Sequence, residues 1–273
     1  MNFSSLVRNK YYELTPSERK VADYILVTGA KIIFNTMNDI KKHTKVGDAT
    51  IIRFCQKLGF SGFSDLKIEI AKEDFNQTAR LTKEDTYLER VGYLQEIIQA
   101  TARQLDKGAM ALAVKQLAQA RHIYIFGVGG SGQSSLILES MFLRVGLKAH
   151  AVIDSHYQAQ VAAILDQRDL VIVFSLSGRT LDSLAAAKIA KQNGVPIIAI
   201  TTHLNSPLAR EADIILQTVV DEFLNGGSLV GKLSQQVVCD LLIWEYSKQE
   251  KIDTTALREK ILRSILPKRS DLE

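Results

Sequence analysis

The chain has 273 residues, of which 46% are hydrophobic and 23% charged, the balance of a globular protein rather than a disordered one. No run approaches the roughly 18 consecutive apolar residues of a membrane helix, and the polar, charged start lacks the apolar segment of a secretory signal. We therefore expect a cytoplasmic protein without a membrane partner. Cys55 and Cys239 stand far apart, outside any metal or redox spacing, and are expected to be buried structural thiols.

Positive charge is concentrated near the N-terminus. Residues 1–78 hold 12 Lys and Arg against 9 Asp and Glu, an excess of +3, whereas residues 79–273 hold 22 against 21, an excess of +1. The basic residues that cluster in the first part are Lys41, Lys42, Lys45, Arg53 and Lys57. Such a patch suits a polyanionic partner, although charge alone fits a solvated helix face equally well.

The pattern of apolar residues divides the chain into a helical part and an alternating part. Residues 1–79 are expected to form an all-α domain, in which Thr15-Pro16-Ser17-Glu18 starts a helix with a hydroxyl cap and an acid three residues on. Residues 80–107 have helical spacing and predict a connecting helix. Residues 108–252 predict an α/β domain, and residues 253–273 a C-terminal helix and tail.

Five β-branched runs supply the expected strands of the α/β domain. They are His122–Val128, Lys148–Ile153, Leu170–Ser175, Pro196–Thr201 and Ile214–Gln217. Helical stretches follow, such as Ser134–Leu143, Tyr157–Leu165 and Thr180–Gln192. This alternation predicts a doubly wound, five-stranded parallel sheet with helices on both faces, and we expect the flavodoxin-like strand order 2-1-3-4-5.

Residues 36–58 have the layout of a helix-turn-helix. Thr36 is placed to cap a helix that runs to about Thr44. The segment Lys45-Val46-Gly47 then makes a tight turn, with Val46 as a buried plug. A second helix follows from about Asp48 to Leu58. Its predicted buried side chains are Ile51, Ile52, Cys55 and Leu58.

The polar side of this second helix predicts DNA recognition. Thr50, Arg53 and Lys57 recur at i, i+3 and i+7, with Gln56 beside them, as on a helix that lies in the major groove. Arg and Gln can read base edges, whereas Lys and Thr mostly hold phosphates. The predicted DNA contacts are Lys45, Asp48, Thr50, Arg53, Gln56 and Lys57.

The segment Thr36–Leu66 resembles the N-terminal DNA-binding domain of RpiR-type transcriptional regulators, the RpiR/MurR type. The most specific part is ATIIRFCQKLGFSGFSDLK, and the resemblance implies that its two Gly-Phe pairs end the recognition helix and hold the next helix against the bundle. The sequence departs from the family at the turn, where Lys45 and Gly47 replace the frequent Gly and Ser. Asp48 is expected to cap the second helix instead.

Two glycine- and hydroxyl-rich loops follow the first and third predicted strands. The first anion loop is Gly127-Val128-Gly129-Gly130-Ser131-Gly132, and the second anion loop is Ser175-Leu176-Ser177-Gly178-Arg179-Thr180. Glycines allow a ligand to approach the backbone closely, and free amides at the start of the next helix point at an anion. Strands 1 and 3 are neighbours at the switch point of the expected sheet, so both loops should face one crevice. This arrangement predicts a phosphate site.

The pair of loops resembles the SIS (sugar isomerase) domain, over roughly Ala109–Ser247. The resemblance implies that Ser131, Ser175, Ser177 and Thr180 hold the phosphate of a sugar phosphate, with Gly129 in the first loop and without a cofactor.

Two further residues are candidates for the sugar end of this site. His156 is placed to reach sugar hydroxyls, including those in a neighbouring subunit's site, because SIS domains usually pair; the alternative is a solvated or helix-capping histidine. Glu222 stands where SIS isomerases carry acid–base residues, and the alternative is a surface carboxylate.

Together these features predict a sequence-specific, DNA-binding transcriptional regulator of carbohydrate metabolism genes rather than an enzyme. The expected partners are double-stranded operator DNA and a sugar-phosphate effector, and the two-fold symmetry common to such operators predicts a homodimer or a dimer of dimers.

Two alternatives remain open at this point. A sugar-phosphate isomerase needs a general base near the sugar carbons, and Glu139, Glu222, His156 and His203 are candidates, although no two share a diagnostic spacing. A NAD-sensing repressor is indicated by the G-x-G-x-x-G match in the first loop, with Asp154 where a ribose-binding acid would stand. The second anion loop argues against it, because a dinucleotide fold does not need one.

Overall fold

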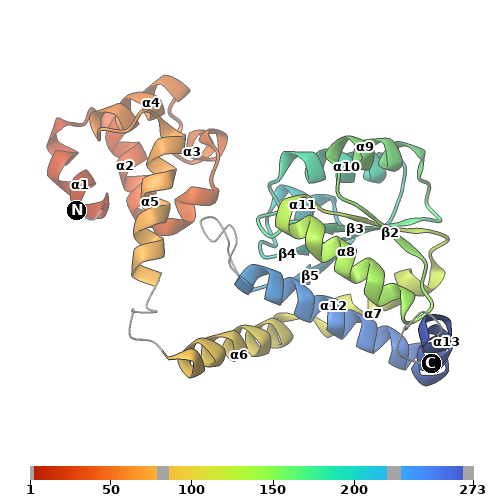
Figure 1. The fold of residues 1–273 in the computed structure, drawn as a ribbon. Helices are drawn as coiled ribbons and strands as arrows, with labels where there is room; N and C mark the ends of the chain where they lie inside the picture. The colour runs from red at the N-terminus through yellow and green to blue at the C-terminus, as the bar shows by residue number, and fades with distance from the viewer. Residues whose placement is uncertain (1–2, 79–85, 220–228, 267–273) are drawn as a thin grey trace. The chain divides into compact units, whose positions relative to one another are not determined.

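The computed structural model describes residues 3–78, 86–219 and 229–266, and the chain divides into two compact units between Thr86 and Tyr87. Figure 1 shows the helices and strands of both units. Each unit has its own hydrophobic core. Within the described ranges, no helix is both long and apolar enough to span a bilayer.

The first unit is all-α, as predicted. Its elements are α1 (Phe3–Lys10), the 3-10 helix η1 (Tyr11–Glu13), α2 (Pro16–Thr28), the 3-10 helix η2 (Gly29–Phe34), α3 (Met37–Thr44), α4 (Asp48–Lys57) and α5 (Phe63–Thr78). The predicted start of α2 is confirmed: the Thr15 side chain accepts from the Glu18 amide, and the Glu18 carboxylate accepts from the Thr15 amide. Cys55 is buried in the core of this unit.

The second unit is an α/β fold built on a five-stranded sheet. Its elements are α6 (Tyr87–Gln104), α7 (Lys107–Gln119), β1 (Ile123–Phe126), α8 (Gly129–Leu143), β2 (Ala149–Val152), α9 (Ser155–Ile164), β3 (Leu170–Phe174), α10 (Leu181–Gln192), β4 (Ile197–Thr201), α11 (Pro207–Glu211), β5 (Ile214–Gln217), α12 (Leu229–Gln249) and α13 (Thr254–Ile265). All neighbouring strands are parallel, in the order β2-β1-β3-β4-β5. The predicted doubly wound sheet and its strand order are confirmed.

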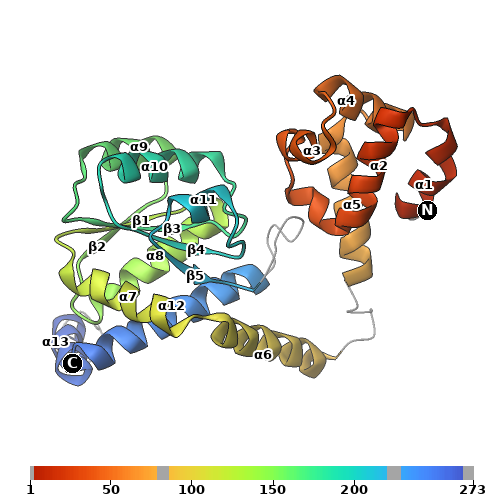
Figure 2. The same cartoon turned by 180° about the vertical axis from the view of Figure 1, so that it is seen from behind.

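Helices cover both faces of this sheet. One apolar cluster joins the sheet to α7, α8 and α12, and a second joins it to α9, α10 and α11 on the opposite face (Figure 2). β3 and β4 are buried along their whole length, as strands of a parallel sheet covered on both faces are. Cys239 is also buried, in the cluster that contains α12.

Helix α6 occupies most of the segment that was predicted to connect the two domains. It packs against α12 inside the second unit. A buried hydrogen bond joins the two helices, with 2.9 Å between the hydroxyl oxygens of Thr101 and Ser234. Thus α6 is the first helix of the α/β unit, which begins at Tyr87.

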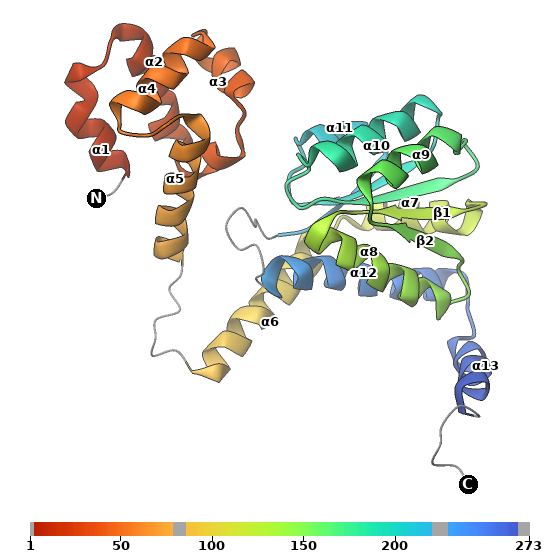
Figure 3. The same ribbon diagram turned by 45° about the horizontal axis from the view of Figure 1, so that its top comes forward.

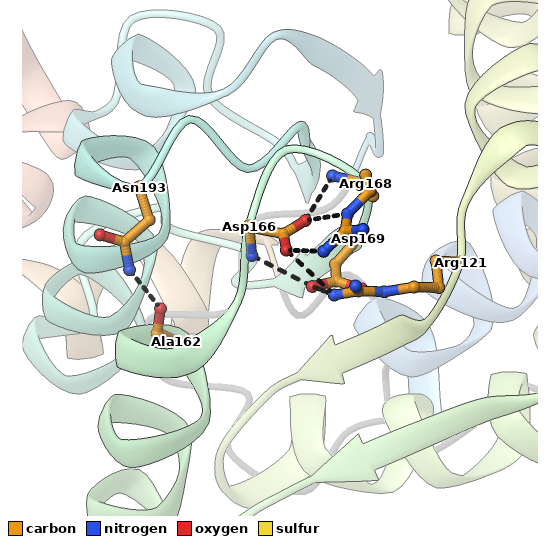
Figure 4. A network of polar contacts seen from close by, with 6 residues as sticks. All are labelled: Arg121, Ala162, Asp166, Arg168, Asp169 and Asn193. Atoms are coloured by element: carbon orange, nitrogen blue, oxygen red, sulfur yellow. Dashed lines mark hydrogen bonds and ion pairs between the residues drawn. The ribbon is translucent and has the colours of Figure 1, made fainter.

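A network of charged side chains fixes the amino-terminal edge of the sheet (Figure 4). Arg121, just before β1, donates to both carboxylate oxygens of the buried Asp169, at 3.0 and 2.8 Å. It also reaches Asp166 at 3.2 Å. Hydrogen bonds from the side chain and backbone of Arg168 hold the pKa of Asp166 well below its usual range. The network ties together the starts of β1 and β3, the two strands whose other ends carry the anion loops.

Candidate functional site

The helix-turn-helix consists of α3 and α4. Thr36 caps α3 in a capping box with Asp39, as expected from the sequence. Lys45 ends α3 in the left-handed conformation, with φ of 58°, and its amide donates to the Lys41 carbonyl at 2.9 Å. The expectation that Asp48 caps α4 is wrong. The extended residue Gly47 occupies the N-cap, and the Asp48 carboxylate accepts instead from Lys41, at 3.1 Å.

The buried face of α4 differs from the prediction at two positions. Ile51, Cys55 and Leu58 are buried as expected, but Ile52 is 38% exposed and Phe54 is buried in its place. The buried side chains at positions 51, 54, 55 and 58 form a single stripe at helical spacing. Ile52 therefore lies on the outer face.

The outer face of α4 carries the side chains that remain available to a partner. Ala49, Ile52, Arg53 and Gln56 are exposed, whereas Thr50 is half-buried. The Arg53 Nε donates to the Ala49 carbonyl at 3.2 Å, so the base of this side chain is held along the helix. Lys45 and Asp48 are exposed at its amino end.

Lys57, one of the predicted DNA contacts, is ion-paired within the first unit. Its ammonium group donates to the Glu18 carboxylate at 2.7 Å and to the Glu13 carbonyl at 3.1 Å. Burial of Glu18 opposes its ionisation, but hydrogen bonds from Lys57 and Thr15 outweigh that effect and lower the Glu18 pKa. Lys57 thus fastens α4 to α2.

Of the α-helices whose N-cap residue is described, α4, α8 and α10 lack a side-chain cap. In the other helices of this group, the side chain of the N-cap residue accepts a hydrogen bond from a backbone amide. These helices are α2 (Thr15), α3 (Thr36), α7 (Asp106), α9 (Asp154), α11 (Ser206) and α13 (Asp253). The N-cap residues of α4, α8 and α10 are Gly47, Val128 and Thr180. First-turn amides have no partner inside their own helix, and the helix dipole favours an anion there.

The first anion loop is shorter than predicted, because α8 begins at Gly129 rather than near Ser134. Ser131 therefore lies in the first turn of the helix. Gly127 cannot carry a side chain, since a Cβ there would lie 2.6 Å from both the Ser131 carbonyl oxygen and the Ser135 Oγ. Gly129 adopts a positive φ of 55°. These glycines bring the amides of the first turn close to the end of β1.

The second anion loop gathers three hydroxyl groups at the start of α10. Ser175 is buried, and its Oγ lies 3.3 Å from the Thr180 Oγ1. The Ser177 Oγ accepts from the Arg179 amide at 3.2 Å, which leaves the Ser177 hydroxyl hydrogen for another acceptor. Gly178 has a φ of 61°, and a Cβ there would collide with Ser206.

Both loops leave the same edge of the sheet at neighbouring strands. Phe126 at the end of β1 is paired with Val173 near the end of β3. Gly127 and Ser175 follow these residues by one and two positions. The register thus confirms the predicted placement of the two loops at the carboxyl ends of the strands on either side of the switch point.

Helix α12 contributes two polar side chains near α8 that sequence reasoning missed. The Lys232 Cε would lie 3.3 Å from a Cβ placed on Gly130. Gln235 is buried and contacts two hydroxyl groups of α8: its Oε1 accepts from Ser134 at 2.6 Å and its Nε2 donates to Ser131 at 3.2 Å. Helices α8 and α12 lie side by side (Figure 3). The available signal was the i, i+3 pair of polar residues in a largely apolar helix.

The structure describes the position of His156 but not that of Glu222, the other candidate for the sugar end of the site. His156 is exposed in the first turn of α9, at the end of β2, and Glu222 lies outside the described residues. Asp154 caps α9 by accepting from the Tyr157 amide at 2.8 Å, and Glu139 accepts from the Ala151 amide at 3.3 Å. In the part of the chain that the structure describes, no His, Cys, Asp and Glu cluster has the arrangement of a metal site.

Comparison with known proteins yields two family matches. Residues 1–77 match the helix-turn-helix domain of the rpiR family, and residues 116–244 match the SIS domain. An HTH-type transcriptional regulator of Haemophilus influenzae is 33% identical, with 98% of each chain covered. The Escherichia coli transcriptional regulator RpiR is 29% identical over 77% of this chain and 74% of its own. The solved structure of the Vibrio vulnificus NanR protein complexed with ManNAc-6P is 25% identical and covers 98% of this chain and 100% of its own, with a TM-score of 0.78.

Proposed function

Because this chain belongs to the RpiR family of transcriptional regulators, with a helix-turn-helix domain and a SIS domain, we propose that it controls carbohydrate metabolism genes in response to a phosphorylated sugar. The observation that carries this proposal is the pair of uncapped helix starts, α8 and α10, that bear hydroxyl groups at one edge of the sheet. The relatives named above are regulators, which favours a sensor over an isomerase.

The proposed DNA surface is the outer face of α4 with the turn before it. Arg53 and Gln56 are suited to base edges, and Ile52 offers an apolar contact to a thymine methyl group. Lys45, Thr50 and the uncapped amides of α4 are suited to backbone phosphates, next to Asp48 at the helix start. Lys57 is left out because it is bound to Glu18.

The proposed effector site holds a phosphate between the two anion loops. First-turn amides near Gly129 and the hydroxyl groups of Ser131, Ser175, Ser177 and Thr180 donate to its oxygens. Lys232 adds positive charge beside α8. His156 faces the sugar end of the ligand, and Glu222 stays a candidate there. The ManNAc-6P bound to NanR supports the phosphosugar class.

We further propose that the protein acts on DNA in the cytoplasm as a homodimer or a dimer of dimers. A two-fold assembly places two recognition helices on two half-sites. Control by the effector requires that the effector bind two states of the assembly with different affinity. Helix α6 is the proposed link, because it packs on α12 and is the first element of the α/β unit in sequence.

A thermal-shift panel tests the effector class. The purified protein is heated with hexose, amino-sugar and pentose phosphates, and with inorganic phosphate, the unphosphorylated sugars and NAD as controls. A ligand at about 100 times its dissociation constant adds about 2.7 kcal/mol of stability. We expect stabilisation by a sugar phosphate and none by the corresponding plain sugar. Stabilisation by NAD alone would instead support a dinucleotide sensor.

A further inference from the structure

The side-chain amide of Gln235 is hydrogen-bonded to two hydroxyl groups of α8. Gln235 is 1% exposed. Its Oε1 accepts from the Ser134 Oγ at 2.6 Å, and its Nε2 donates to the Ser131 Oγ at 3.2 Å. Each end of the amide therefore has a partner, and both partners lie in the first two turns of the helix at the first anion loop.

These two hydrogen bonds decide what the Ser131 hydroxyl can do. An amide nitrogen is a donor only, so the Ser131 oxygen accepts from it, and the hydroxyl hydrogen is not used in this contact. The opposite amide orientation would present Oε1 to Ser131 and bind that hydrogen instead. The Ser134 contact distinguishes the two orientations by its length: 2.6 Å is within the range of an O–H donor and shorter than the roughly 2.7–3.2 Å usual for an N–H donor, so Oε1 is the amide atom that faces Ser134. Ser131 is thereby presented to a ligand as a donor.

We propose that Gln235 is the positioning residue of the effector site: it turns the Ser131 hydroxyl hydrogen toward the bound phosphate. This inference rests on the proposed function and extends it to the protonation state of the anion that is recognised. A fixed donor favours ligand oxygens that carry no hydrogen. The first loop then prefers acceptor-only anions, such as sulfate or an ionised phosphate oxygen.

The first test compares Gln235→Met with Gln236→Met, which makes the same change one residue along α12. The Gln236 Nε2 has no hydrogen-bond partner among the described residues. Dissociation constants for sulfate and inorganic phosphate are measured by calorimetry, with circular dichroism to check folding. We expect Gln235→Met to weaken sulfate binding roughly tenfold, the worth of one charge-assisted hydrogen bond, and Gln236→Met to leave it unchanged.

The ratio of the two anions separates a positioning role from a packing role. In Gln235→Met the Ser131 hydroxyl rotates freely and can accept from the hydrogen that hydrogen phosphate carries, whereas sulfate has none to give. Sulfate affinity should therefore fall more than phosphate affinity. Equal losses for both anions, or no loss, would overturn the proposal.

A double-mutant cycle shows whether Gln235 acts through Ser131. In a Ser131→Ala background, adding Gln235→Met should change sulfate affinity by less than about twofold, because the effects of substitutions at two coupled residues are not additive. The same tenfold loss in both backgrounds would contradict the proposal.

A second variant keeps the shape of the side chain, so the test survives if Gln235→Met fails to fold. Gln235→Glu places a carboxylate oxygen where Nε2 stood, and that oxygen takes the Ser131 hydrogen and repels the ligand. Both anions should then bind more than about tenfold more weakly. Wild-type affinity in Gln235→Glu would overturn the positioning role alone. A wild-type protein that binds neither inorganic phosphate nor any sugar phosphate would instead overturn the effector site itself.

Discussion

At the residue scale, the turn between α3 and α4 holds a lysine in a conformation that favours glycine. Lys45 has a φ of 58° and a ψ of 30°, which strains a residue with a Cβ. Lys45→Gly should raise the free energy of unfolding by about 0.5–1 kcal/mol, after allowance for the greater freedom of glycine in the unfolded chain. Urea unfolding measures this change.

The same variant should bind DNA less tightly, because it lacks one proposed phosphate contact. The slope of log affinity against log salt should become shallower by about 1. Arg8→Gly serves as a control, since it removes a positive charge on α1, which is not part of the helix-turn-helix. An unchanged salt dependence in Lys45→Gly would remove Lys45 from the DNA surface.

Glu18 makes the stability of the first unit depend on pH. The folded-state pKa of Glu18 is lowered, because hydrogen bonds from Lys57 and Thr15 outweigh burial. Its contribution to stability is therefore present above the unfolded pKa, about 4.3, and is lost as the pH falls through the lowered folded value. Wild type should exceed Glu18→Gln in unfolding free energy at neutral pH, and the difference should shrink in acid. A difference that stays constant with pH would contradict the ionised pair with Lys57.

Single residues of α4 show where local patterns stop being informative. The adjacent pair Ile51 and Ile52 fits two different apolar stripes, and only the packed bundle selects the one that buries Phe54. Lys57 has the spacing of a DNA contact, yet its partner Glu18 lies 39 residues away in sequence. Helix periodicity predicted the motif, but it could not identify contacts made between helices.

At the element scale, the second anion loop depends on Gly178. A Cβ there would collide with Ser206, and the φ of 61° adds strain. Gly178→Ala should lower the free energy of unfolding by about 2–4 kcal/mol and abolish stabilisation by sugar phosphate. Gly194→Ala is the matched control, because Gly194 has a φ of 73° with open space around it and should cost only about 1 kcal/mol. If thermal unfolding shows that Gly178→Ala and Gly194→Ala lose the same stability, the contact with Ser206 is unimportant.

The boundaries of the elements were predictable where side chains mark them. The capping residues Thr15 and Thr36 marked the starts of α2 and α3, and β-branched runs marked the five strands. The start of α8 was placed too late because glycines are poor helix formers. In the fold, small residues at 127 and 132 let this helix approach its neighbours closely, since a Cβ at Gly132 would lie 3.2 Å from Ile153. Gln235 lies 104 residues beyond Ser131, so no local pattern joined them.

At the scale of the whole molecule, we propose that α6 carries the influence of the α/β unit on DNA binding. The buried contact between Thr101 and Ser234 joins α6 to α12, one residue from Gln235. Thr101→Val keeps the shape of the side chain and removes this hydrogen bond, at a cost of about 1 kcal/mol. We expect the variant to bind sugar phosphate and DNA separately, but with a weaker effect of one ligand on the other. Calorimetry measures the affinity for sugar phosphate. DNA titration with and without sugar phosphate measures the affinity for DNA and the effect of one ligand on the other.

A matched control distinguishes coupling from a general loss of packing. Thr254→Val removes a hydroxyl group from α13, which is not part of this contact, and should leave coupling unchanged. If Thr101→Val responds to the effector as wild type does, α6 does not transmit through this hydrogen bond.

The two-domain character of the molecule was the most predictable property, because each domain carries its own local pattern. Helical spacing with a basic patch marked the first, and strand–helix alternation with two glycine-containing loops marked the second. The sequence could not indicate that α6 packs with the second unit. That contact depends on apolar and hydroxyl groups more than 100 residues apart, such as Thr101 and Ser234.

The central claim is that a sugar phosphate in the SIS domain controls DNA binding by α4. Its most direct test is a fluorescence titration of DNA with the protein. The DNA is first selected from a random library by the wild-type protein, and the titration is run with and without the sugar phosphate that stabilises the protein in the thermal-shift panel. We predict that the effector changes wild-type DNA affinity by about 5–150-fold. Arg53→Ala should lose DNA affinity worth about 1–3 kcal/mol yet keep its thermal shift, whereas Ser177→Ala/Thr180→Ala should bind DNA normally and ignore the effector. An effector that stabilises the wild-type protein without changing its DNA affinity, or that still acts on the Ser177→Ala/Thr180→Ala variant, would contradict the claim.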